Sequence, residues 1–384
     1  MGKKGKIKED KFEISIILPC RNEEKALPEC LRKIKDVINK YHINAEIIVS
    51  DSSCDSSPDI ARENKVKLVK HDKVGYGIAY LEGFKEAKGK YIFMADADLT
   101  YDFKEIPNFL KYLREGYDFV IGDRFAYKME KGTMSWSHKY IGNPILSGIL
   151  RLFYGTSVKD SHCGMRAISR EALDKLNLRT TGMEFASEMV IKAVKNHLKI
   201  KEVPIKYYPR KGESKLRSFS DGWRHLRFML LYSPLFLFFI PGLILFLVGL
   251  ELMLWFYFGS PEVLGIKLYY HPMFFSSLSI IIGYQLIVFA FFTKTYAITH
   301  LGEENDFMNR LHRFLTIEKV SLFGIFISLL GLIIYIMILL KWLKSGFGEL
   351  EQIKNSILGL TLLAIGIQTI FSSFMLSILG IKED

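Results

Sequence analysis

Four long apolar runs in the second part of the chain constrain its fold most. Each has about the 20 residues that a helix needs to cross the hydrocarbon core of a bilayer. They span residues 235–258, 272–293, 320–340 and 357–379. Buried helices of a soluble domain are the alternative, but such a domain rarely contains four runs of this length in succession. The chain is therefore predicted to be a multi-pass membrane protein.

The part before these runs is mixed and charged, like a soluble domain, up to about residue 227. Its first 13 residues are charged and lack an apolar core, so we expect no signal peptide and a domain that stays in the cytoplasm. Segment 206–227 then holds seven basic residues against two acidic ones, directly before the first apolar run. This bias fits the positive-inside rule. With four spans, both termini of this integral cell-membrane protein are predicted to be cytoplasmic.

The basic balance of the chain bears on its partners. The formal net charge of +11 alone would suit nucleic acid, but the sequence has no nucleic-acid motif and its basic residues concentrate beside the membrane. We therefore expect contact with anionic membrane lipid and no nucleic acid. The four cysteines lie in the soluble part without metal-like spacing, which favours free thiols in a reducing compartment.

Strands and helices are predicted to alternate through the soluble part. Apolar, β-favouring runs at residues 14–18, 46–49, 66–69 and 90–95 predict strands, and apolar spacings of three and four residues between them predict helices. Short connections of this kind are typical of a mostly parallel, Rossmann-like sheet with helices on both faces. The predicted fold is an α/β domain at 1–216, an amphipathic interfacial segment at 217–232 and a four-helix membrane domain at 233–384.

Polar side chains follow three of these strands at the point where each ends. Asp96 and Asp98 come after the strand at 90–95, Asp51 after 46–49, and Glu23 shortly after 14–18. Ligands of such sheets bind at the carboxyl ends of the strands. Side chains two residues apart on an extended backbone point to the same side, so Asp96 and Asp98 are predicted to bind Mg²⁺ or Mn²⁺ that bridges to a diphosphate. The alternative interpretation is that Asp96 and Asp98 only cap a turn or a helix, and the same alternative applies to Asp51 in its serine-rich loop.

Basic residues further along the chain suit phosphate groups. Arg124 follows a predicted strand at 118–121 and is a candidate for a bidentate contact with a diphosphate. Arg210, Ser214 and Lys215 surround a flexible glycine just before the membrane, and they are candidates for binding a phosphate that arrives at the membrane surface. Ordinary positive-inside charge is the alternative for this group, although it does not predict the Gly-x-Ser-Lys arrangement.

Two further groups of residues are open to more than one interpretation. Glu184 and Glu188 lie one turn apart on a predicted helix, and one of them is a candidate for binding sugar hydroxyls. Asp160, His162 and Cys163 contain the residue types of a nucleophile constellation, but a buried structural turn is the favoured interpretation.

Taken together and in this order, the motifs resemble those of the family-2 glycosyltransferases of the GT-A fold. The resemblance is strongest to the dolichol-phosphate mannose and glucose synthases, which act on polyprenyl phosphates, and it covers about residues 14–215. It rests on Ile17-Leu18-Pro19 through Asn22-Glu23, residues 49–55, Gly75-x-Gly77-x-Ala79, Asp96-Ala97-Asp98-Leu99, Gly122-Asp123-Arg124, residues 160–166 and Arg210-Lys211-Gly212-Glu213-Ser214-Lys215.

The resemblance implies roles for individual residues and shows two departures. In the donor site, Asp96 and Asp98 would hold the metal, and Arg124 would bind the phosphates. The nucleotide would be contacted by Pro19, Glu23, Asp51 and Asp96. The lipid phosphate would be bound by Arg210, Ser214 and Lys215. As departures, Thr100 stands where the family often has Gln, and Asp123 stands where it commonly has Ser.

The implied function is an inverting, metal-dependent transfer of one hexose from a UDP- or GDP-sugar to polyprenyl (dolichyl) phosphate at the cytoplasmic membrane face. A phosphate monoester is already anionic near neutral pH, so this acceptor requires no general base. The Gln-x-x-Arg-Trp motif of processive relatives does not occur in the sequence, which disfavours polymerisation. The alternatives are a same-fold transferase acting on a membrane glycolipid or cell-surface glycan, and a non-catalytic membrane scaffold or lipid-translocation component.

Overall fold

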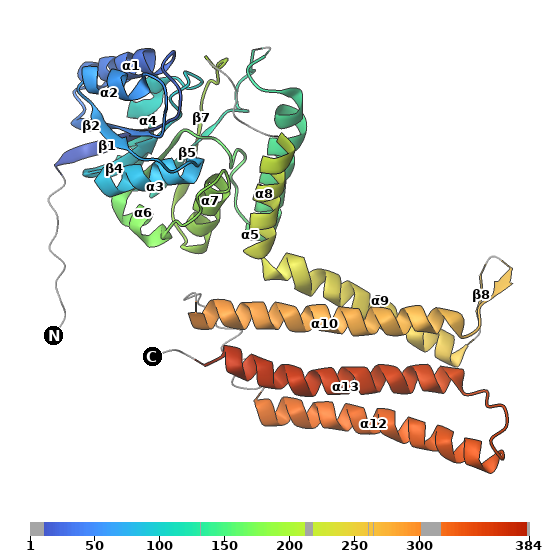
Figure 1. The fold of residues 1–384 in the computed structure, drawn as a ribbon. Helices are drawn as coiled ribbons and strands as arrows, with labels where there is room; N and C mark the ends of the chain where they lie inside the picture. Colours follow the sequence, from blue (N-terminus) through green and yellow to red (C-terminus); the bar gives the residue numbers. More distant parts are fainter. Residues whose placement is uncertain are drawn as a thin grey trace, which may run out of the picture. The chain divides into compact units, whose positions relative to one another are not determined.

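The computed structural model describes residues 11–130, 132–211, 218–259, 261–263, 265–300 and 316–381. The chain divides into two compact units, Met1–Met229 and Leu230–Asp384 (Figure 1). The first unit contains the sheet and the second contains the long apolar helices. The boundary between them falls inside segment 217–232, which the sequence sets apart as interfacial. Each unit is described by itself below.

A mixed sheet forms the centre of the first unit. Its described strands follow the order β3-β2-β1-β4-β6-β5-β7. Strand β1 pairs in parallel with both β2 and β4, and Ile16 faces Ile47 on one side and Phe93 on the other. These three residues are buried, as a strand covered on both faces requires. The strands are β1 Phe12–Cys20, β2 Ala45–Asp51, β3 Lys67–Lys70, β4 Gly89–Met94, β5 Phe119–Asp123, β6 Arg166–Ser169 and β7 Ile200–Pro204.

Strand β6 is the main departure from the predicted topology. The sequence analysis predicts no strand at these residues, because four residues are too few to show a strand period. In the structure β6 runs antiparallel to both β4 and β5, and Arg166 pairs with Met94 and with Ile121. The beginning of β6 therefore lies beside the carboxyl ends of β4 and β5, and this brings the loop before β6 to the same edge of the sheet.

Helices follow most strands, as the apolar spacing predicts. Helix α3 packs directly on β1, because Gly83 has no side chain and a Cβ there would lie 2.7 Å from Ile17 Cγ2. The α/β interpretation of this unit, with a mostly parallel sheet, is confirmed. Its helices are α1 Leu27–Lys40, α2 Ser57–Glu63, α3 Tyr76–Glu86, η1 Phe103–Glu105, α4 Ile106–Arg114, η2 His138–Gly142, α5 Asn143–Tyr154, α6 Arg170–Leu176, α7 Phe185–Lys195 and α8 Ser218–Leu231.

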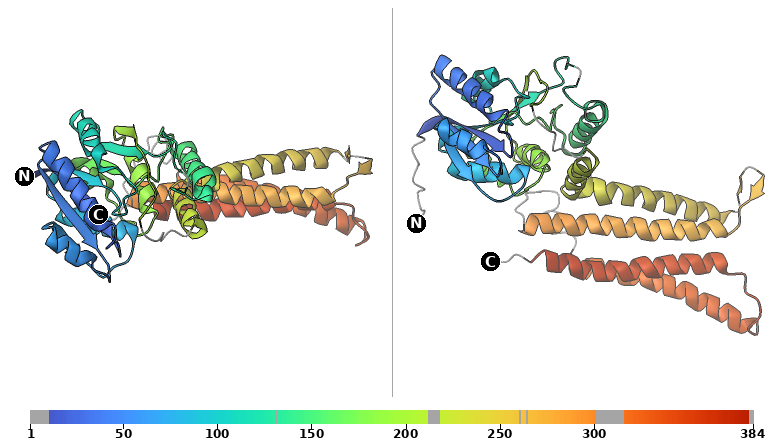
Figure 2. Two further views of the ribbon diagram at one scale, coloured as in Figure 1. Left: turned by 90° about the horizontal axis from the view of Figure 1, so that it is seen from above. Right: turned by 45° about the horizontal axis from the view of Figure 1, so that its top comes forward.

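The second unit contains four helices that are long and apolar enough to cross a membrane, among the described residues. The four predicted spans are therefore confirmed as helices, and three of them extend beyond the predicted ends. Figure 2 shows them running alongside one another, with α9 packed on α10, α10 on α13, and α12 on α13. Their bounds are η3 Leu235–Phe239 with α9 Ile240–Phe258, α10 His271–His300, α12 Ile317–Lys344 and α13 Ile353–Leu379.

Glycines and hydroxyl pairs hold these helices together. A Cβ on Gly324 would lie 2.8 Å from the carbonyl oxygen of Gly366, so α12 and α13 touch through their backbones. Between α10 and α13, the hydroxyls of Ser277 and Thr361 lie 2.6 Å apart. At the end of α9, the ammonium of Lys354 donates to the carbonyl oxygen of Phe256 at 2.6 Å. Lys354 thus caps a helix end that would otherwise leave its carbonyls without donors.

Candidate active site

The predicted convergence of polar strand ends is present in the structure. Cys20 at the end of β1 pairs with Asp51 at the end of β2, and Met94 at the end of β4 pairs with Ile17. Asp96 and Asp98 follow β4 by two and four residues. The carboxyl ends of β1, β2 and β4 thus bring the Asp96–Asp98 pair, Asp51 and the loop containing Glu23 to one edge of the sheet.

Asp96 lies in a closely packed group of oxygen atoms. A Cβ on Gly164 would lie 2.7 Å from Asp96 Oδ2, 3.0 Å from the Tyr101 hydroxyl and 3.2 Å from the Tyr76 hydroxyl, so a side chain at this position would displace these oxygens. Burial and the neighbouring charge of Asp98 raise the pKa of Asp96 to about 7, although Arg210, Arg124 and a hydrogen bond from Tyr76 oppose this shift. The sequence analysis assigned no role to Tyr76 or Gly164, and nothing in their residue type marks either as part of a site.

The two carboxylate oxygens of Asp98 have different partners: Thr100 binds one, and the guanidinium of Arg210 lies near the other. Its Oδ1 accepts hydrogen bonds from the Thr100 amide at 3.1 Å and from the Thr100 hydroxyl at 2.6 Å. Leu99 between them adopts φ 65°. The other oxygen, Oδ2, lies 3.6 Å from Nη1 of Arg210. Thr100, one of the two departures from the family pattern, thus orients Asp98.

The residues at this edge fit a divalent cation in part. Carboxylate oxygens are the donors that Mg²⁺ and Mn²⁺ prefer, and Asp96 and Asp98 bring two carboxylates close enough that the charge of Asp98 helps to raise the pKa of Asp96. However, the described residues contain no group of three or more His, Cys, Asp or Glu side chains arranged to hold a metal. Asp96 and Asp98 would therefore hold a cation whose remaining ligands come from substrate oxygens and water.

The loops after β1 and β2 are bound to each other. The amide of Asn22 donates to the Ser53 hydroxyl at 2.7 Å, and the side-chain oxygen of Asn22 accepts from the Cys54 amide at 2.9 Å. Asp51 is fully buried, and its Oδ2 accepts from the ammonium of Lys70 at 2.8 Å and from the Ser53 amide at 3.2 Å. The structure therefore gives Asp51 contacts within the protein in addition to its predicted contact with a nucleoside.

Arg210 reaches this edge from the far end of the domain. Its Nη2 donates to the Glu23 carboxylate and its Nη1 faces Asp98. The segment that carries it is fixed by the backbone, because the Tyr208 amide donates to the Thr100 carbonyl at 2.9 Å and the Lys211 amide to the Asp98 carbonyl at 3.2 Å. A predicted acceptor residue thus lies among the predicted donor residues. Its two companions, Ser214 and Lys215, lie outside the described residues.

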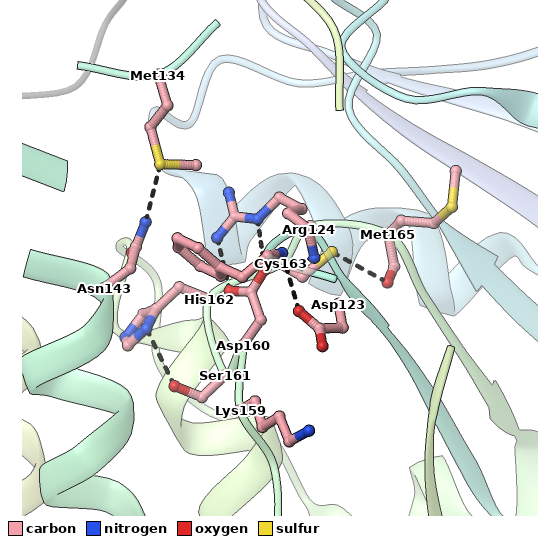
Figure 3. Close-up of polar contacts among 12 residues, drawn as sticks. Asp123, Arg124, Met134, Asn143, Lys159, Asp160, Ser161, His162, Cys163 and Met165 are labelled. Carbon is pink, nitrogen blue, oxygen red and sulfur yellow. Dashed lines mark hydrogen bonds and ion pairs between the residues drawn. The ribbon is translucent and has the colours of Figure 1, made fainter. Parts of the chain in front are cut away.

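Arg124 is engaged in a buried ion pair (Figure 3). Its Nε and Nη2 donate to the two carboxylate oxygens of Asp160, each at 2.7 Å, and its amide donates to Asp160 Oδ2 at 3.1 Å. The guanidinium lies 5.2 Å from the ring centroid of Tyr207.

The second departure from the family pattern, Asp123, precedes Arg124 in the chain. It accepts a hydrogen bond from the Phe125 amide at 2.9 Å and so stabilises its own turn. The structure shows Arg124 as a structural cation next to the site, and a contact with phosphate stays a prediction.

The interpretation of residues 160–163 as a structural turn fits the geometry better than a nucleophile constellation. Burial raises the pKa of the Cys163 thiol to about 12, so the thiolate is not available near neutral pH. Burial holds the pKa of His162 well below its usual value, and the ring lies against His225 of α8 with centroids 4.4 Å apart. The Ser187 hydroxyl lies 2.8 Å from His225 Nδ1, which joins α7 to α8. These residues hold the loop and α8 in place.

The two glutamates of α7 differ in their surroundings. Glu188 is fully buried, and its carboxylate accepts from the Thr180 amide at 2.8 Å and from the ammonium of Lys192 at 2.7 Å. Glu184 is half-buried at the start of the helix, and its Oε2 has no hydrogen-bond partner among the described residues. Of the pair, only Glu184 therefore has a carboxylate oxygen without a partner among the described residues, although that oxygen is itself buried, and its contact with a sugar hydroxyl stays a prediction.

The chain matches known protein families over both units. Residues 15–176 match the sequence model of glycosyl transferase family 2, and residues 292–380 match that of the glycosyltransferase family 2 C-terminal transmembrane region. The low-salt glycan biosynthesis hexosyltransferase Agl6 of Haloferax volcanii is 38% identical over 368 residues, which cover 96% of this chain and 89% of that protein.

A second relative and a solved structure each match more than half of this chain. The dolichyl-phosphate hexose transferase of Haloferax volcanii is 31% identical over 211 residues, or 55% of this chain and 89% of that protein. The crystal structure of glucosyl-3-phosphoglycerate synthase from Mycobacterium tuberculosis gives a TM-score of 0.47 at 20% identity, and the match covers 58% of this chain and 80% of that one.

Proposed function

Because the chain belongs to glycosyltransferase family 2 and carries the transmembrane region of that family, we propose that it transfers one hexose from a nucleotide-sugar to a polyprenyl phosphate such as dolichyl phosphate. The observation that carries this proposal is the position of Arg210, whose guanidinium contacts Glu23 and faces Asp98. A cation suited to an acceptor phosphate thus lies next to carboxylates suited to the donor. The similarity to a dolichyl-phosphate hexose transferase supports the same acceptor.

On the donor side, Asp96 and Asp98 would hold Mg²⁺ or Mn²⁺, which neutralises charge on the diphosphate leaving group when it is bound. Pro19 and Asp51 lie at the ends of β1 and β2, and Glu23 lies in the loop after β1. These three residues would contact the nucleoside. Thr100 keeps Asp98 in a fixed orientation through two hydrogen bonds to the same oxygen. Glu184, with an unpartnered carboxylate oxygen, would accept hydrogen bonds from the sugar.

On the acceptor side, Arg210 would bind the lipid phosphate together with Ser214 and Lys215. A phosphate monoester carries most of its second negative charge near pH 7, so its oxygen attacks without a general base and inverts the configuration of the sugar carbon. The protein must instead offset the repulsion between two anionic substrates. This explains why the site combines acidic and basic residues.

The membrane unit agrees with an acceptor that is embedded in lipid. We place the catalytic domain and both termini on the cytoplasmic face of the cell membrane, because basic residues concentrate between 206 and 227, before the first span. Family membership makes the chain a glycosyltransferase, so the interpretation as a non-catalytic scaffold is set aside. A second candidate remains, transfer to a lipid-linked or surface glycan, since Agl6 is named for glycan biosynthesis.

The proposed function is tested by supplying the purified full-length protein with a short polyprenyl phosphate and a panel of UDP- and GDP-hexoses. We expect one donor to yield a hexosyl-phosphoryl lipid, identified by mass spectrometry, and the yield to vanish with a metal chelator and return with Mg²⁺ or Mn²⁺. A product on a glycan acceptor, with none on polyprenyl phosphate, would select the second candidate. Product formation that is indifferent to the chelator would contradict the metal assignment.

Replacing Arg210 with Gln separates the two acceptor types. Hydrogen bonds to charged groups contribute about 1.5–3 kcal/mol, so we expect the KM for polyprenyl phosphate to rise roughly tenfold or more. Lys206→Gln, which removes an exposed charge from the same segment, serves as the matched control and should leave that KM unchanged. If the acceptor lacks a phosphate, steady-state kinetics of Arg210→Gln will show an unchanged acceptor KM.

A further inference from the structure

Tyr76 is the first residue of α3, and its hydroxyl lies at the catalytic edge. It donates a hydrogen bond to the carboxylate of Asp96. The two side chains meet at Gly164, where a Cβ would lie 2.7 Å from Asp96 Oδ2 and 3.2 Å from the Tyr76 hydroxyl. Asp96 nevertheless keeps partial exposure to solvent. The protein thus encloses one side of this carboxylate, and the exposed side can accept a ligand.

The ring of Tyr76 is held in place by its neighbours. It makes edge-on contacts with the buried rings of Tyr80 and Phe185, at centroid distances of 5.1 and 6.3 Å. The backbone at this end of α3 is equally confined, because a Cβ on Gly77 would lie 2.2 Å from the carbonyl oxygen of Thr180. The packing therefore fixes where the Tyr76 hydroxyl points before any ligand binds.

The neighbouring carboxylate is oriented by a hydroxyl as well. Oδ1 of Asp98 accepts a hydrogen bond from the Thr100 hydroxyl at 2.6 Å. Each carboxylate of the predicted metal pair thus receives a hydrogen bond from a side-chain hydroxyl, Asp98 from Thr100 and Asp96 from Tyr76. Groups that orient metal ligands in this way are worth roughly 10–100-fold in metal affinity.

We propose that Tyr76 is a positioning residue for Asp96, whose hydroxyl binds one oxygen of the carboxylate and directs the other toward the cation. Tyr101 supports this arrangement, because its hydroxyl accepts from the Gly164 amide at 2.7 Å and so holds the backbone of Gly164 against Asp96. The inference rests on the metal dependence in the proposed function. It goes beyond that function by assigning a role to a residue that binds neither substrate nor metal.

Binding of Mn²⁺ to the purified full-length protein tests the proposal. Water-proton relaxation is followed while Mn²⁺ is added in the presence of saturating UDP and, in parallel, of saturating GDP, because Mn²⁺ on the protein relaxes water faster than Mn²⁺ on free nucleotide. With the nucleotide that binds, Tyr76→Phe should raise the Kd of Mn²⁺ roughly tenfold or more. In the transferase assay, high Mn²⁺ should restore most of the rate of this variant.

Two pairs of variants separate positioning from general damage. Tyr91→Phe removes a buried tyrosine hydroxyl from β4 and should leave the Kd of Mn²⁺ unchanged. Gly164→Ala should raise this Kd, because its methyl group displaces Asp96 Oδ2. Its matched control is Gly148→Ala, whose Cβ would meet no atom closer than 3.9 Å and which should have no effect.

The outcomes distinguish this inference from the proposed function. If the wild-type protein binds Mn²⁺ and Tyr76→Phe binds it equally well, the inference is overturned and the metal assignment stands. A loss of activity in Tyr76→Phe that high Mn²⁺ does not restore would show a structural role and would also overturn it. If the wild-type protein binds no Mn²⁺ with either nucleotide, the metal assignment of the proposed function fails, and the role of Tyr76 fails with it.

Discussion

Replacement of Asp96 with Asn should reduce hexose transfer by roughly two to three orders of magnitude, because the substitution removes one of the negative charges that hold a cation against the diphosphate. Asn keeps the size of the side chain, so the packing against Gly164 and the hydroxyls of Tyr76 and Tyr101 is preserved. Asp98→Asn should have a similar effect, since it alters the carboxylate that Thr100 orients. Initial rates of lipid-linked hexose formation at saturating donor measure both effects.

A control on the same loop distinguishes loss of charge from general damage. Asp102 caps η1 by accepting from the Lys104 amide at 3.1 Å, and Asn caps helices about as well as Asp. Asp102→Asn should therefore retain activity. In the Asp96 and Asp98 variants, the affinity for the nucleoside diphosphate, measured by calorimetry, should become insensitive to Mg²⁺ and Mn²⁺. Full activity in the Asp96→Asn/Asp98→Asn double variant would refute the metal assignment.

Replacement of Arg124 with Met should destabilise the first unit by roughly 3–5 kcal/mol, because it leaves the fully buried carboxylate of Asp160 without its cation. For a domain of this size the expected fall in Tm is on the order of 10 °C. Thermal unfolding of the detergent-solubilised protein, followed by near-ultraviolet circular dichroism, measures the change. Asp160→Asn should destabilise as well, since it leaves the guanidinium unpaired.

An exposed pair with the same geometry provides the comparison. Arg114 donates from Nε and Nη2 to the Glu13 carboxylate at 2.7 and 2.8 Å, but its side chain is half exposed. Arg114→Met should cost no more than about 1 kcal/mol. If Arg124→Met is as mild as this control and instead raises the KM for the donor, then Arg124 acts on the phosphates and its structural role is minor.

The sequence predicts the catalytic edge of the sheet because the relevant information is local. A strand that ends in two carboxylates can be recognised from a few residues, and parallel strands bring their carboxyl ends together wherever they lie in the chain. Strand β6 is not recognisable in this way, because its four residues show no period and its antiparallel direction is decided by pairing with β4. The position of the loop at 160–165 beside Asp96 therefore could not be predicted.

Contacts between distant residues explain what else could not be predicted. Arg210 and Glu23 are separated by 187 residues, and no local pattern reveals that they meet. The basic character of segment 206–227 indicated a membrane surface or a phosphate, while the structure adds the acidic partners of Arg210. In the same way, composition could not separate Glu184 from Glu188, because only the folding of residues 179–180 around Glu188 encloses one of them.

The late pairing of β6 and β7 has a consequence for biosynthesis. Strand β4 has no partner on its β6 side until Arg166–Ser169 has been made, and β5 waits for β7, which ends at Pro204. The first span begins at Leu235, only 31 residues later. At a synthesis rate of about 5–20 residues per second, that span leaves the ribosome within seconds of the last strand. The last strand of the catalytic sheet and the first span therefore emerge within seconds of each other, so folding of the first unit can overlap with membrane insertion of the second.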